Sequence, residues 1–275
     1  MADKISLTQA VRGNLLSLQR TSTGIDQTQT RLSTGLRVSS AIDDAAAFFT
    51  ARAFDNRASD LESLKSNIDL AISTIQAAID GIDAITDIVQ QAKGIASAAK
   101  ATGDTNERST LAVQFNELLS QINSIANDST FNGLNLLQAS PDNLAVEFNE
   151  DNTSNLTITG LDATTATSGI NIAVAANNFG LNANIDTALT AISSALTTLR
   201  SNASTLGSNN TILTTRLDFT TNLVNTLETG SGKLTLADLN EESANLLALQ
   251  TRQQLGLNSL ALASQSERAI LSLFG

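Results

Sequence analysis

The chain has 275 residues, with 16 Lys and Arg against 27 Asp and Glu, a single Pro, and no His, Cys, Trp or Tyr. The lack of His and Cys removes the commonest metal ligands, every Cys nucleophile and every Ser-His pair, so we expect no enzyme, no cofactor and no metal site. The formal charge of −11 argues against a phosphate-binding surface and hence against a nucleic-acid partner.

The N-terminus predicts a first helix. Ser6 and Gln9 have the spacing of a capping box, and Gly35 marks the end. These first residues hold scattered charges and no long apolar run, so we expect neither a cleaved signal nor a membrane partner. The apolar residues that recur along this helix, mostly at a spacing of seven, are Val11, Leu15, Leu18, Ile25 and Leu32.

A long rod follows, because apolar residues recur at an unbroken spacing of seven from Phe54 to Ala96. At 1.5 Å per residue this helix extends roughly 65 Å, so it needs equally long partners. Ser40 followed by Asp43 and Asp44 predicts its capped start, and Gly103 its end.

The middle of the chain changes pattern. Asp104 with Glu107 predicts the cap of a further helix, which forms a hairpin with the rod. Beyond it, Asn132-Gly133 and Asp151-Asn152 are turn signals between short alternating segments, which predict β-hairpins. The alternating apolar residues are Leu144, Val146 and Phe148, then Leu156 and Ile158, then Ile170, Ile172 and Val174.

Helical periodicity returns from Ile185 to Leu227 and predicts a second long rod, the natural partner of the first. Gly230 and Gly232 are expected to break this rod. Thr235 followed by Asp238 is expected to cap a final helix that runs to the C-terminus. The apolar seam of that helix contains Leu239, Leu246, Leu249, Leu260, Ile270 and Phe274.

The two terminal helices carry more apolar surface than one partner covers. Leu15 and Leu16 are adjacent, as are Leu246 and Leu247, and adjacent residues lie about 100° apart around a helix. Burying a few such leucines among copies of the chain supplies several kcal/mol, at about 1.5–3 kcal/mol each. The alternative, which periodicity leaves open, is that these leucines pack onto the long rods within one bundle.

Three stretches carry a family resemblance. They are residues 32–38 (LSTGLRV) with 40–46 (SAIDDAA), residues 130–133 (TFNG) followed by Leu136-Leu137, and the closing residues 269–274 (AILSLF). On these motifs the chain resembles bacterial flagellin. The resemblance implies a helical homopolymer used for motility, exported by a type III apparatus to the extracellular flagellum. It also implies a filament cap, hook-filament junction proteins and an export chaperone as partners.

The resemblance further implies a mainly α fold: a long antiparallel coiled-coil-like bundle with a small β-hairpin region and paired N- and C-terminal helices. The expected divisions are an inner coiled-coil domain from residues 1–40 and 234–275, an outer helical rod from 41–127 and 181–233, and a β-hairpin part at 128–180. The residues expected at the polymer interface are Val11, Leu15, Leu18, Ile25, Leu32, Leu246, Leu249, Leu260, Ile270, Leu271 and Phe274.

One departure from the resemblance concerns immune recognition. Flagellins detected by Toll-like receptor five carry an Arg and a facing Glu, and the apparent equivalents here are Gln91 and Asn116, although Ile95 keeps an apolar position. The resemblance therefore implies weak or absent recognition by this receptor.

Three alternative hypotheses compete with a flagellin. A hook-filament junction protein shares related end motifs, whereas a type III secreted translocator or helical effector would not polymerise. The least favoured alternative is an enzyme, a hydrolase that uses carboxylates without histidine. Asp43-Asp44 is its nearest candidate pair, but no Lys or third carboxylate is adjacent to complete a site, which favours helix capping.

Overall fold

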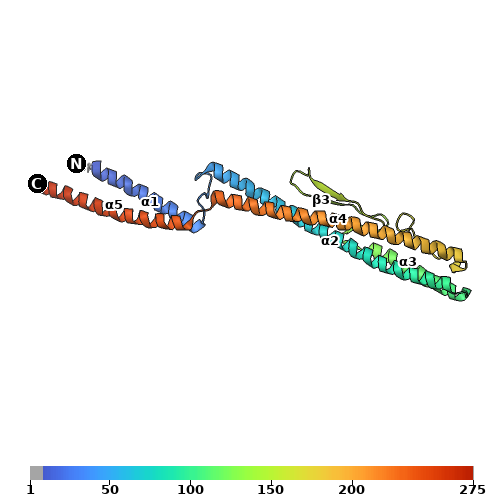
Figure 1. The fold of residues 1–275 in the computed structure, drawn as a ribbon. Helices are drawn as coiled ribbons and strands as arrows, with labels where there is room; N and C mark the ends of the chain where they lie inside the picture. The colour runs from blue at the N-terminus through green and yellow to red at the C-terminus, as the bar shows by residue number, and fades with distance from the viewer. Residues whose placement is uncertain (1–8, 275) are drawn as a thin grey trace. The chain divides into compact units, whose positions relative to one another are not determined.

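The structure, a computed structural model, describes residues 9–274, with the side chains of all except Ala10, Glu267 and residues 270–274. Ser6, the expected first cap, lies outside them. The chain is mainly helical, which confirms the predicted fold class (Figure 1). The helices are α1 (Gln9–Thr34), α2 (Ala45–Ala101), α3 (Thr105–Asp128), α4 (Asn182–Thr235) and α5 (Leu239–Phe274), with a short 3-10 turn η1 (Ala176–Phe179).

The contacts divide the chain into two compact units. Unit 1 takes Met1–Arg57 with Thr226–Gly275, and unit 2 takes Ala58–Asn225. Unit 1 therefore contains α1, α5, the segments that connect them to the long helices, and the first turns of α2 beside the last turns of α4. Because the two units are separate bodies, each is described by itself.

Unit 2 is built on the predicted apolar seams. Within it, α2 and α4 run in opposite directions, and Lys100 near the end of α2 is paired with Asp186 near the start of α4. A spacing of seven residues is close to two helical turns, so the residues at this spacing lie on one face of each helix and pack into the core. The seam residues that are essentially inaccessible to solvent are Ile68, Ile75, Ile82 and Val89 on α2 and Ile185, Ile192, Leu199, Leu206 and Leu213 on α4.

The third helix of unit 2 also follows its predicted signals. Asp104 caps α3, and its side chain accepts a hydrogen bond from the Asn106 N–H at 2.8 Å. The Phe115 ring meets the Phe179 ring edge to face, with 5.2 Å between centroids. This aromatic contact packs η1 against α3.

Two small hairpins complete unit 2. β1 (Thr130–Phe131) pairs with β2 (Leu134–Asn135) across Asn132-Gly133, where both residues have the positive φ that a tight hairpin turn requires. β3 (Leu144–Glu147) pairs with β4 (Asn155–Ile158), antiparallel throughout. Both hairpins occur where the alternation and the turn residues predicted them.

The strand expected through Ile170 and Val174 is wrong. The N–H groups of Ile170 and Ile172 donate to carbonyls at Thr164 and Thr165, and the segment has no strand partner. Ile172 is buried, whereas Val174 is 68% exposed. The alternation of apolar residues thus marks an irregular segment that has one side in the core. The backbone N–H groups of this segment are satisfied by the preceding turn and not by a strand.

The expected start of α2 is displaced. Ser40 does not cap the helix: α2 begins at Ala45, and the side chain of Asp44 accepts a hydrogen bond from the Ala47 N–H at 3.0 Å. Ser40 instead donates its N–H and its hydroxyl to Asp43. The acidic pair is therefore divided between two roles, with Asp44 at the helix and Asp43 in the connector.

The expected break at Gly230 and Gly232 is also wrong, because α4 continues through both glycines to Thr235. A Cβ on Gly230 would lie 3.3 Å from the Phe54 ring, and one on Gly232 would lie 3.1 Å from Leu236. The glycines allow close packing rather than ending the helix. The cap of α5 is Asp238 rather than Thr235, because its Oδ1 accepts from the Asn240 N–H at 2.9 Å.

Candidate assembly interface

The helices α1 and α5 form one antiparallel pair (Figure 1). Near the chain ends, Asn14 Nδ2 donates to Ser259 Oγ at 3.5 Å. At the opposite end of the pair, Arg31 Nη1 lies 2.9 Å from Glu242 Oε1. Residue numbers rise along α1 as those of their partners fall along α5, so the two helices stay in contact over most of their length.

Two glycines set the close approach within this pair. A Cβ on Gly256 of α5 would lie 2.8 Å from Leu18 of α1, and a Cβ on Gly24 of α1 would lie 3.4 Å from Leu249 of α5. Each helix thus offers a glycine to a leucine of the other. The leucine side chains fill the space that the missing Cβ atoms leave.

The expected interface residues occupy three kinds of position. Val11 and Ile25 are buried within unit 1. The half-buried set lies along the contact between the helices and consists of Leu18, Leu32, Leu246, Leu249 and Leu260. Leu15 is 40% exposed, while the side chains of Ile270, Leu271 and Phe274 lie outside those described. The described residues at the expected spacing, apart from Leu15, are therefore covered, wholly or partly, by the chain itself.

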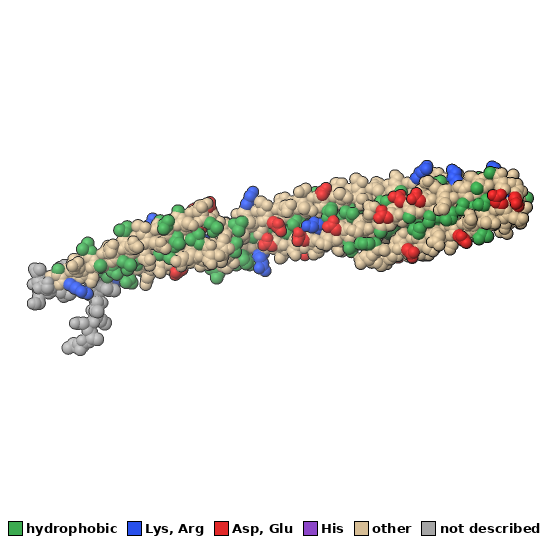
Figure 2. Space-filling model, turned by 90° about the horizontal axis from the view of Figure 1, so that it is seen from below, with side chains coloured by type: hydrophobic (Ala, Val, Ile, Leu, Met, Phe, Trp, Pro, Cys, Tyr) green, Lys and Arg blue, Asp and Glu red, His purple; other side chains and the backbone are tan. Residues whose placement is uncertain are grey.

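A second set of leucines on α1 and α5 remains largely exposed. Their exposed fractions run from 40% for Leu15 to 70% for Leu262, above those of the seam. Figure 2 shows hydrophobic side chains distributed over the surface of the terminal helices. We call this set the outer leucines: Leu15, Leu16, Leu247, Leu255, Leu257 and Leu262.

Leu15 is among the interface residues predicted from the sequence. The adjacency of Leu15 with Leu16, and of Leu246 with Leu247, also marked Leu16 and Leu247 as surplus apolar surface, because neighbours on a helix cannot share a seam. Leu255, Leu257 and Leu262 lie between the seam positions of α5 and share no spacing of seven with them. The seven-residue spacing therefore identifies the residues of the seam and does not identify these three leucines.

The connectors on either side of the helix pair are joined to each other. Leu36 forms an isolated antiparallel bridge with Leu236, and the Ala237 N–H donates to the Gly35 carbonyl at 2.9 Å. The Arg37 N–H donates to the Thr235 carbonyl at 2.7 Å. The two connectors thus form a short ribbon that closes unit 1 between α1 and α5.

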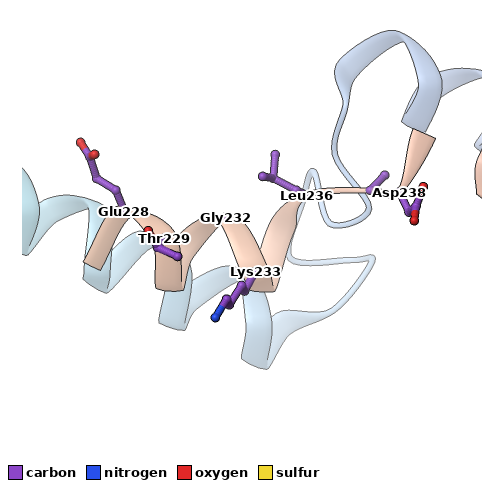
Figure 3. Close-up of a pocket in the computed structure, with 7 residues that line it drawn as sticks. Glu228, Thr229, Gly232, Lys233, Leu236 and Asp238 are labelled. Atoms are coloured by element: carbon purple, nitrogen blue, oxygen red, sulfur yellow. The ribbon is translucent and has the colours of Figure 1, made fainter. Parts of the chain in front are cut away.

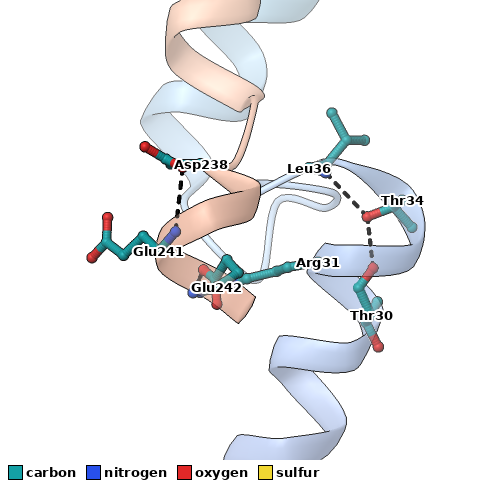
Figure 4. A network of polar contacts seen from close by, with 7 residues as sticks. All are labelled: Thr30, Arg31, Thr34, Leu36, Asp238, Glu241 and Glu242. Carbon is teal, nitrogen blue, oxygen red and sulfur yellow. Dashed lines mark hydrogen bonds and ion pairs between the residues drawn. The ribbon is translucent and has the colours of Figure 1, made fainter. Parts of the chain in front are cut away.

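A polar network holds the junction of this ribbon with the two helices (Figure 4). The Glu242 side chain is only 9% exposed and is compensated by the Arg31 guanidinium, which makes it the one deeply placed charge of the junction. Thr34 Oγ1 accepts from the Leu36 N–H at 3.2 Å, and its own hydroxyl donates to the Thr30 carbonyl. These bonds fix the turn at the end of α1.

Asp43 organises the connector before α2. Its Oδ2 accepts hydrogen bonds from the N–H and the hydroxyl of both Ser39 and Ser40, at 2.9–3.1 Å. The bonds from the Ser39 hydroxyl and N–H, followed by those from Ser40, lower the pKa of Asp43 because they stabilise its ionised form. The neighbouring Ile42 is held with 96% of its surface exposed.

An open groove lies along the last turns of α4 and the second connector (Figure 3). Glu228, Lys233 and Asp238 give it mixed charge, and Leu236 is 59% exposed there. Nothing in this groove pairs a nucleophile with a base. Within residues 9–274, no three His, Cys, Asp or Glu side chains are grouped as metal ligands, and no helix combines the length and hydropathy needed to cross a membrane.

The charges of the chain are divided unequally between the units. The residues of unit 1 include ten Lys or Arg and ten Asp or Glu, whereas those of unit 2 include six and seventeen. The whole formal charge of −11 therefore belongs to unit 2. Unit 1 is electrically balanced, so copies of it approach each other without net repulsion.

Two family models match the chain, one toward each end. Residues 5–142 match the family model described as the bacterial flagellin N-terminal helical region, and residues 189–274 match the bacterial flagellin C-terminal helical region. Flagellin FljO of Caulobacter vibrioides is 35% identical over 95% of this chain and 96% of its own length. A flagellin of Brucella melitensis is 31% identical over 94% and 95%. The crystal structure of Bacillus cereus flagellin aligns with a TM-score of 0.49 and 19% identity, over 56% of this chain and 88% of that one.

Proposed function

The chain belongs to the bacterial flagellin family and is a structural subunit of the flagellar filament, and from that premise we propose that it polymerises through the outer leucines of α1 and α5. The single observation that carries the proposal is their exposure, up to 70% for Leu262, within a unit whose own helix contact is already filled. A filament subunit provides other copies to cover such a surface.

The energy available supports this assignment. A leucine that becomes fully buried contributes about 1.5–3 kcal/mol, so covering even half of the outer leucines contributes several kcal/mol per subunit. Because these side chains point in several directions around the pair, one partner does not cover them all. Contacts between unlike surfaces of identical subunits give a filament where the rotation between neighbours does not close into a ring.

The residues of the seam take a different part in this proposal. Val11 and Ile25 are buried in the contact between α1 and α5, so they hold the pair together and present the outer leucines. Leu18 and Leu249 do the same through their glycine partners. We keep Ile270, Leu271 and Phe274 as proposed polymer contacts on the strength of their place at the end of α5 alone.

The domain division is proposed on the same basis. The inner domain comprises residues 1–40 and 234–275, the outer rod comprises 41–127 and 181–233, and the β-hairpin part comprises 128–180. The ribbon of the two connectors, at Leu36 and Leu236, supports a boundary near the ends of α1 and α4. The acidic excess of unit 2 supports a position at the water-facing side of the filament.

Family membership also supports the route by which the subunit reaches its place. We propose export by the flagellar type III apparatus, with an export chaperone, hook-filament junction proteins and a filament cap as partners, to the extracellular flagellum. The subunit works mechanically: a stiff helical tube transmits the rotation of a motor. The proposal requires no catalytic step.

We further propose that Toll-like receptor five responds weakly to this subunit. Asn116 accepts a hydrogen bond from the Ala175 N–H at 2.8 Å, so its side chain is engaged within the chain, and Gln91 carries no charge on the exposed face of α2. A receptor reporter assay with purified monomer tests this. A signal comparable to that of a strongly recognised flagellin would contradict it.

Seeded growth tests the assignment of the interface. Leu247→Gln and Leu262→Gln are expected to raise the critical concentration for growth on filament fragments about tenfold or more each, as lost burial of a leucine implies. Val174→Gln is the matched control, because Val174 is 68% exposed in unit 2. Growth of both leucine variants at the wild-type critical concentration would contradict the proposal, and circular dichroism of the monomers checks that the helices are intact.

A further inference from the structure

Charge is segregated along the antiparallel pair of α1 and α5. Toward the chain ends, the pair contains Arg12 and Arg268 against Glu267, and Arg20 and Arg252 lie near its middle. The half toward the connectors contains Asp26, Glu241 and Glu242 against Arg31, with Asp238 as the cap of α5. The pair is therefore acidic toward the connectors and basic over the rest of its length, although unit 1 as a whole is neutral.

Two of the arginines lie in one groove. Arg20 of α1 and Arg252 of α5 both line a groove of about 510 Å³ between the helices, together with Leu18, Leu249 and the outer leucine Leu255. Both arginines are exposed. Among the side chains that the structure describes, neither guanidinium has an ion-pair partner. The groove therefore combines unpaired positive charge with walls in which the leucines alternate with Asn14, Ser17, Thr21 and Ser259.

Glu241 is the acidic counterpart that remains, because Asp26 shares a groove with Arg31 and Arg37 of its own chain. Glu242 is already held by Arg31, and Asp238 is engaged as the cap of α5. The Glu241 side chain is exposed, and Figure 4 shows it directed away from the Arg31–Glu242 pair. Its place in the first turn complements the helix dipole, which accounts for an acidic residue there but leaves Arg20 and Arg252 unexplained.

We propose that the Arg20–Arg252 groove of one subunit receives Glu241 of a second copy of this chain. The guanidinium groups offer planar pairs of N–H donors to a carboxylate, and the surrounding leucines of both copies exclude water from the contact. The groove and Glu241 are different surfaces, so the contact repeats from head to tail, as the contacts of an open helical filament do. The inference rests on the proposed polymerisation through α1 and α5.

The sequence separation fixes the stagger between the two copies. Glu241 and Arg252 are eleven residues apart on α5, so parallel neighbours are displaced by roughly 16 Å along the helix axis. The contact is therefore lateral and staggered. It gives the neighbours a defined register, which the non-directional burial of leucines does not supply.

Charge reversal tests the pairing. Arg252→Glu and Glu241→Lys are each expected to raise the critical concentration for seeded growth roughly tenfold, because each places like charges together in the contact. An equimolar mixture of the two variants, and the double variant, are expected to return toward the wild-type value, since both restore opposite charges at every contact. Asp151→Lys, on the exposed turn between β3 and β4, is the matched control for the change of net charge.

The outcomes separate this inference from the function on which it rests. Single reversals that grow like the wild type, or variants that neither the mixture nor the double change rescues, would overturn the pairing. If in either case Leu247→Gln still raises the critical concentration for growth, polymerisation through the terminal helices stands without the pairing. Monomer melting curves followed by circular dichroism show whether Glu241→Lys acts through the stability of α5, an effect that the mixture does not rescue.

Discussion

The side chain of Leu18 lies against Gly256, at a position where a Cβ would approach its Cδ2 to 2.8 Å. Leu18 belongs to α1 and Gly256 to α5, which are separated by most of the sequence. A β-carbon at Gly256 would move the leucine or part the helices. Leu18 and Gly256 therefore place α1 and α5 in one pair, and their close contact accounts for a glycine in the middle of a helix.

Replacing Gly256 tests this contact. Gly256→Val is expected to destabilise the pairing of α1 with α5 by about 1–3 kcal/mol through overpacking, and the melting temperature of the monomer measures it. Gly13→Ala in α1 is the matched control, because nothing lies within 4 Å of a Cβ built there. That change is expected to stabilise the helix by about 0.5–1 kcal/mol. Equal melting temperatures for Gly256→Val and the wild type would refute the contact.

The Arg31–Glu242 pair is expected to depend on both partners. Arg31→Ala leaves the Glu242 carboxylate, 9% exposed, without its compensating charge and is expected to cost about 1–2 kcal/mol. Arg31→Ala combined with Glu242→Gln is expected to recover part of this loss, because no uncompensated charge remains. Thermal unfolding of the single and double variants measures the coupling. Additive effects would show that the two side chains act separately.

The connector at Asp43 is expected to loosen in acid. Folding lowers the pKa of Asp43, so its hydrogen bonds contribute fully above the pKa of the unfolded chain and are lost as the pH falls through the lowered value. An NMR titration of the carboxyl group is expected to give a midpoint below about 3.9, the value of an unperturbed aspartate. Asp43→Ala is expected to remove the protection of the Ser39 and Ser40 amides at every pH. A midpoint at or above the unperturbed value would contradict the hydrogen bonding of Asp43 with Ser39 and Ser40.

The sequence predicted those parts of the fold whose determinants are local and repeated. The seven-residue seams put Ile68, Ile75 and Ile82 in the core because helix geometry converts spacing directly into a face. Asn132-Gly133 predicted its turn because both residues tolerate positive φ, and Gly35 ends α1 for the same reason.

The errors arose where a residue type has two structural uses. A glycine such as Gly230 indicates either a helix end or a close contact with another element. The sequence alone does not show that Phe54 packs against it, so the two cases could not be told apart. The alternation of Ile170 and Ile172 recorded burial but not the absence of a strand to pair with. The proposed assembly surface was hardest to predict, because the seam residues show their spacing in the sequence while the exposure of Leu255, Leu257 and Leu262 depends on how α1 pairs with α5.

The structure of a filament grown from the purified protein, solved by electron cryomicroscopy, shows which surfaces join the subunits. We expect the outer leucines, among them Leu247 at 66% and Leu262 at 70% exposure in the single chain, to be buried against α1 or α5 of neighbouring copies. A filament held together by other surfaces, with these leucines still facing water, would contradict this expectation.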